Sequence, residues 1–216
     1  MRPWPLTIAV VGVLLSPIVV RAARAADFPI VIRTYDASGL PEADRMAAMV
    51  AATAILEDAG LTIRRLACDQ VASPVDGHAC LAPLRAHELS LRLVRLPPSN
   101  RGGDPVTLAY SLVDGPMRFG ALATVYVGRV TDLAAAARVD VPTLLGRAIA
   151  HEIGHLLLGT AAHAAVGVMR ASWSPDALRH STARDWRFTP ADAEALRAAA
   201  RRRTGDLKPS GSPATW

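Results

Sequence analysis

The segment that decides the fold of this 216-residue chain spans residues 146–170 and reads GRAIAHEIGHLLLGTAAHAAVGVMR. Within it, His151, Glu152 and His155 form the pattern H-E-x-x-H. Two histidines four residues apart lie on one face of a helix, so both imidazoles can reach one zinc ion. The glutamate between them can then polarise a zinc-bound water. Burying these three groups in an apolar helix would be costly without a partner such as a metal ion.

The residues after this pattern supply candidates for a third ligand. Gly159 is expected to end the helix, His163 follows at loop spacing, and Met169 comes shortly afterwards. Three neutral imidazoles would hold zinc and leave a fourth position open for water. Two alternatives to His163 remain, namely His180 and Glu194, the latter giving the His-His-Glu ligand set of thermolysin-like enzymes. The order of glycine, histidine and methionine favours His163.

This arrangement resembles the metzincins, whose motif is H-E-x-x-H-x-x-G-x-x-H followed by a methionine turn. The spacing here is H-E-x-x-H-x-x-x-G-x-x-x-H, with one extra residue before Gly159 and another after it. The resemblance implies a zincin-like domain with His151, His155 and His163 as zinc ligands and Met169 as the apolar floor beneath them. It also implies peptide hydrolysis by zinc-bound water with Glu152 as general base. The segment is also similar to secreted bacterial proteins, a likeness that supplies no activity.

The pattern along the rest of the chain predicts a single α+β domain over residues 27–203, with a mixed twisted sheet. A β-α-β start favours a parallel strand pair with a right-handed crossover. The expected strands are 28–35, 61–68, 88–96, 106–113 and 121–130. The expected helices are 41–59, one beginning at Pro142 and one from Thr189-Pro190 to about residue 203, while 69–87, 97–105 and 172–187 are expected to be irregular.

The N-terminal segment reads as a secretory signal peptide over residues 1–26. It has a positive start, an apolar run and a small-x-small cleavage site, although an uncleaved membrane anchor is the alternative. Removing Arg2, Arg21 and Arg24 leaves 21 basic against 19 acidic residues, which does not argue for nucleic acid or an anionic membrane as partner. Residues 204–216 are expected to form a disordered tail. The mature protein is therefore predicted to be secreted or periplasmic.

Cys68 and Cys80 are the two cysteines of the chain. Export would place them in an oxidising compartment, which favours a disulfide between them. Two free buried thiols, or a thiolate that blocks the zinc, are the competing interpretations.

Together these features predict a secreted zinc-dependent endopeptidase that is expected to be a monomer. An extended peptide substrate is expected to pair with residues 121–127 as an edge strand, with Trp173 in the loop that sets specificity. The main alternative is a secreted zinc-binding interaction module or an inactive protease relative. Retention of Glu152 argues against it, because a structural zinc site has no use for the base. A third reading treats the motif as incidental in a binding domain.

Overall fold

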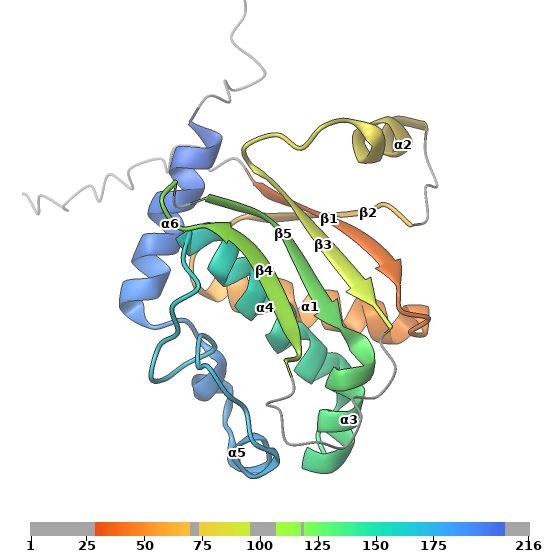
Figure 1. Cartoon of the computed structure of the whole chain (residues 1–216), viewed down its shortest axis with the longest axis vertical. Coiled ribbons are helices and arrows are strands. Elements are labelled where there is room, and N and C mark those ends of the chain that lie inside the picture. The colour runs from red at the N-terminus through yellow and green to blue at the C-terminus, as the bar shows by residue number, and fades with distance from the viewer. Residues whose placement is uncertain (1–28, 70–73, 96–106, 118, 206–216) are drawn as a thin grey trace, which may run out of the picture.

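A mixed five-stranded sheet forms the centre of the computed structural model, which describes residues 29–69, 74–95, 107–117 and 119–205 (Figure 1). The strand order is β2-β1-β3-β5-β4, with β4 antiparallel to β5 and the other neighbours parallel. The predicted α+β domain with a mixed sheet is confirmed. The strands are β1 (Ile30–Ala37), β2 (Ile63–Ala67), β3 (Glu88–Val94), β4 (Ala109–Asp114) and β5 (Phe119–Tyr126).

Helices α1 (Glu42–Asp58) and α4 (Val141–Leu158) lie side by side against one face of the sheet (Figure 1). Alternating strand residues such as Leu89, Leu91 and Leu93 are fully buried on that face, as a period of two requires. The two helices approach closely at Gly146, where an added Cβ would lie 2.6 Å from the Ala51 Cβ. This packing fixes α4, which carries H-E-x-x-H, against the core.

The ends of α4 and of the last helix follow from local capping. The Asp140 carboxylate accepts from the Thr143 backbone N–H at the start of α4, with Pro142 in the first turn. Helix α6 (Pro190–Thr204) begins with the expected Thr189 cap, whose hydroxyl accepts from the Asp192 N–H. Both helix starts are close to those predicted from the sequence.

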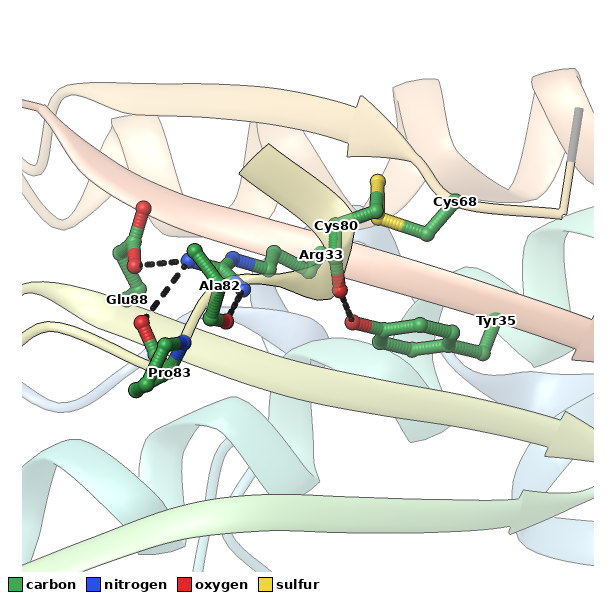
Figure 2. The surroundings of a disulfide bond; sticks show 7 residues. All are labelled: Arg33, Tyr35, Cys68, Cys80, Ala82, Pro83 and Glu88. Carbon is green, nitrogen blue, oxygen red and sulfur yellow. Dashed lines mark hydrogen bonds and ion pairs between the residues drawn. A yellow bond between two sulfur atoms is a disulfide. The ribbon is translucent and has the colours of Figure 1, made fainter. Parts of the chain in front are cut away.

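The opposite face of the sheet carries the disulfide and a short helix (Figure 2). Cys68, just after β2, is bonded to Cys80, so the predicted disulfide is present. The buried Arg33 guanidinium pairs with the Glu88 carboxylate and donates to the carbonyl of Ala82. The expectation of an irregular segment over 69–87 is wrong in part, because α2 (Pro74–Leu81) forms there. Eight residues with an internal glycine are too few to show a helical period in the sequence.

The prediction of one strand over 121–130 is also wrong in its second half, because α3 (Val127–Ala137) follows β5 directly. The β-branched residues Val127 and Val130 suggested a strand, but with Ala134 and Ala137 they form the buried stripe of a helix. The expected edge strand at 121–127 is likewise wrong. Strand β5 is paired on both sides, by β3 and β4, so β4 is the edge strand next to α4.

The predicted irregular connection 172–187 contains the short helix α5 (Pro175–His180) and a 3₁₀ turn, η1 (Ala183–Trp186). Three expectations lie outside the described residues: the signal peptide, the loop 97–105, and the tail beyond Gly205. Within the described residues, none of the helices combines the length and apolarity that crossing a membrane requires.

Candidate metal centre

Helix α4 buries all three polar residues of the H-E-x-x-H pattern. His151, Glu152 and His155 are 8%, 5% and 5% exposed, in a helix whose neighbouring positions are apolar and buried. Burial is the main reason that the pKa of His151 falls to about 4 and that the pKa of His155 falls below its usual value. Both imidazoles are therefore neutral at pH 7, which is the form that binds metal ions.

Two backbone carbonyls fix the tautomer of these imidazoles. His151 Nδ1–H donates to the carbonyl of Val168 at 2.8 Å, and His155 Nδ1–H donates to the carbonyl of Thr160 at 2.8 Å. A neutral imidazole has one N–H, so each Nε2 then presents a bare lone pair. The two Nε2 atoms lie 2.9 Å apart with no proton to share, an arrangement that a cation between them would stabilise.

His163 joins this pair from the loop after α4. Its ring centroid lies 5.3 Å from that of His151 and 4.9 Å from that of His155, and one ligand atom from each of the three lies within 4.8 Å of the others. Gly159 allows the longer spacing because it ends the helix at φ 64°, a left-handed conformation that glycine adopts without strain. The Ala164 N–H then donates to the Met169 carbonyl at 2.9 Å, which ties the loop back beneath α4.

The other two candidate ligands lie elsewhere. His180 is exposed on α5, where its ring bonds to the Asp176 carbonyl of its own helix, and Glu194 is exposed on α6. Within the described part of the chain, neither side chain belongs to the histidine cluster.

Met169 packs against the helix turn that separates the two histidines. It is buried, and an added Cβ at Gly154 would stand 2.7 Å from its sulfur. Gly154 therefore makes room for Met169, and the adjacent Val168 supplies the carbonyl that orients His151. Through these two contacts, the loop after α4 packs against the helix and holds the ring of His151 in place.

Glu152 has a hydrogen-bond partner that sequence patterns did not indicate. The Ser111 hydroxyl on β4 donates to Glu152 Oε2 at 2.5 Å. Burial raises the pKa of Glu152 to about 7, and the Ser111 hydrogen bond opposes the rise. Burial therefore disfavours the ionised form of this carboxyl, and the hydrogen bond from Ser111 favours it.

A tryptophan ring contacts His151 of the cluster. The Trp173 ring meets the His151 ring edge to face, with centroids 5.6 Å apart, and meets Trp186 in the same way at 4.9 Å. Trp186 is in turn covered by the guanidinium of Arg147 at 4.1 Å. Trp173 thus lies beside the cluster, in the loop expected to set specificity.

The residues present fit a zinc ion. Three neutral imidazoles are a donor set that zinc uses in sites with an open position for water, and the facing Nε2 lone pairs give them a common target. Both α4 histidines have the carbonyl partners at Nδ1 that ligating histidines commonly have.

Comparison with known proteins gives matches at the level of solved structures. No protein-family model matches the chain, and no curated protein does either. A zinc-dependent peptidase from Methanocorpusculum labreanum matches with a TM-score of 0.46 and 18% identity, covering 76% of this chain and 99% of that one. Archaemetzincin from Methanopyrus kandleri matches with a TM-score of 0.48 and 16% identity, covering 84% of this chain and 99% of that one.

Proposed function

We propose that this protein is a secreted zinc-dependent endopeptidase, with His151, His155 and His163 as zinc ligands and Glu152 as general base. The observation that carries the proposal is the pair of bare Nε2 atoms 2.9 Å apart, with a third imidazole beside them and a buried glutamate on the next helix position. A structural zinc site needs no such glutamate, and burying one there is costly.

The chemistry divides between the metal and this chain's own groups. Zinc, when bound, would supply a Lewis acid that polarises the scissile carbonyl and makes water more acidic. Glu152 takes a proton from the attacking water and passes it to the leaving amine. The carbonyls of Val168 and Thr160 keep the two α4 imidazoles in the ligating tautomer. Met169 supports the cluster from below.

The substrate is proposed to be a peptide in extended conformation. Strand β4 is the terminal strand of the sheet and contacts α4, so a peptide that pairs with its outer edge would run past the histidine cluster. This assigns to β4 the role that the sequence suggested for residues 121–127. Signal-peptide cleavage near residue 26 would deliver a catalytic domain of residues 27–203 to the periplasm or the exterior.

The alternative is a secreted zinc-binding module or an inactive protease relative. Both alternatives retain the ligands and differ in the use of Glu152. The hydroxyl that Ser111 directs at its carboxylate favours catalysis, because a module has no reason to orient that group.

Hydrolysis of a broad fluorogenic peptide library by the zinc-loaded mature protein tests the proposal. Glu152→Ala should abolish turnover while keeping stoichiometric zinc, and chelation should abolish turnover in the wild type. Glu194→Ala, on the exposed face of α6, is the matched control and should keep wild-type activity. Turnover that survives in Glu152→Ala would refute the mechanism. A zinc-loaded wild type that cleaves nothing would favour the module.

A further inference from the structure

The Ser111 hydroxyl contacts Glu152 at two points. Its Oγ lies 2.5 Å from the carboxylate Oε2 and 2.9 Å from the backbone carbonyl oxygen of the same residue. In the part of the chain that the structure describes, Ser111 is the one residue that hydrogen-bonds to this carboxylate. The contact joins the edge strand β4 to the middle of α4, between the two histidines.

The sheet itself fixes this position of Ser111. Ser111 pairs with Ala123 of β5, which is fully buried on the face that packs against α4. Directly paired strand residues point to the same face, so Ser111 points toward α4 while its neighbours Tyr110 and Leu112 point away. The hydroxyl therefore reaches Glu152 because of strand register and does not depend on a flexible loop.

The Ser111 hydroxyl engages one of the two oxygens of the Glu152 carboxylate. It donates its proton to Oε2, and Oε1 receives no hydrogen bond from the described residues. The contact therefore restricts rotation of the carboxylate and leaves Oε1 available to another partner.

We propose that Ser111 is a positioning residue for the general base: it holds Glu152 Oε2 so that Oε1 faces the attacking water. This inference rests on the proposed peptidase function and adds a residue to it. The simpler reading is that Ser111 only joins β4 to α4. That reading predicts a loss of stability on its removal, whereas positioning predicts a loss of turnover at unchanged zinc affinity.

The test compares Ser111→Ala and Ser111→Thr in the zinc-loaded full mature chain, on one peptide found in the library. Ser111→Ala should lower kcat by about 10- to 100-fold, with KM and the zinc Kd within about twofold of wild type. Ser111→Thr keeps the hydroxyl on a residue suited to strands and should recover most of the loss. The matched control is Ser90→Ala on β3, half-buried on the opposite face of the sheet, which should leave kcat unchanged.

A further measurement separates positioning from general damage. Crystal structures of the zinc-loaded variants give a result that does not depend on turnover. The Glu152 carboxylate should keep one orientation with serine or threonine at position 111 and adopt others with alanine.

Wild-type kcat in Ser111→Ala would overturn the inference while leaving the peptidase proposal standing. So would equal losses in the alanine and threonine variants, since the hydroxyl would then not be what matters. Joint loss of zinc affinity and kcat in Ser111→Ala would assign the residue a structural role and also overturn it. A zinc-loaded wild type without peptidase activity would overturn both proposals together.

Discussion

Replacing Glu152 by glutamine should change the pH dependence of stability in the zinc-free protein. Burial raises the pKa of the Glu152 carboxyl from 4.5 to about 7 in the folded state. Because the folded pKa is the higher one, the contribution of this group to the free energy of unfolding is fully present below pH 4.5. That contribution is lost as pH rises through about 7. The difference of 2.5 between the two values corresponds to about 3 kcal/mol. Glutamine has a similar shape and no charge, so it avoids this loss.

His151 affects the pH dependence of stability in the opposite direction, so the effect of Glu152 has to be measured as a difference between the variant and the wild type. Its folded pKa of about 4 lies below the usual 6.5, chiefly through burial, so its contribution is present above pH 6.5 and is lost as pH falls toward 4. The two effects oppose each other in the wild type between about pH 4.5 and 6.5. The difference between Glu152→Gln and wild type cancels the histidine effect, which is common to both proteins.

The assay is urea unfolding of chelator-treated protein with the disulfide intact, followed by tryptophan fluorescence. The glutamine variant should match the wild type at pH 4.5 and exceed its unfolding free energy by about 3 kcal/mol at pH 8. Saturating zinc should reduce the difference, because a nearby cation stabilises the ionised carboxylate. The exposed Glu194→Gln serves as control and should follow the wild type at both pH values. A difference that is the same at pH 4.5 and pH 8 would refute the burial argument.

Two predictions concern packing and the disulfide. Gly154→Ala would place a Cβ 2.7 Å from the Met169 sulfur and 2.9 Å from a Phe188 ring carbon, so urea unfolding should show a loss of about 1–3 kcal/mol, with weaker zinc binding in chelator titrations. Unchanged stability and zinc affinity would mean that Met169 does not support the site. Replacing Cys68 and Cys80 together by serine opens a loop with a sequence separation of 12 and should cost about 3 kcal/mol of unfolding free energy. Because the disulfide lies on the face of the sheet opposite α4, zinc affinity should stay within about twofold of wild type. A larger change would contradict the independence of the disulfide and the histidine cluster.

The parts of the site that the sequence predicted are those fixed by local geometry. His151 and His155 share a helix face because of their spacing, and Gly159 ends that helix because it adopts a positive φ. The displaced His163 still reaches the pair, since the loop is tied to Met169 by a backbone hydrogen bond. The sequence also predicts the Thr189 cap of α6, because a cap acts within one helical turn.

The parts that the sequence could not give depend on tertiary arrangement. Chain order does not reveal that β4 lies outside β5, so the edge strand was assigned to the wrong segment. Ser111 was missed because its contact with Glu152 depends on strand register and on how α4 packs against the sheet. In α3, the β-branched Val127 and Val130 favoured a strand locally, and packing against α4 overrode that preference.

The most direct test of the account is zinc binding by the purified mature protein and its histidine variants. Metal analysis should find one zinc per chain, and competition with a chelator should show that His163→Ala weakens binding by at least about 10-fold. His180→Ala and Glu194→Ala should bind zinc as the wild type does. Wild-type protein without stoichiometric zinc, or His163→Ala with wild-type affinity, would contradict the three-histidine site.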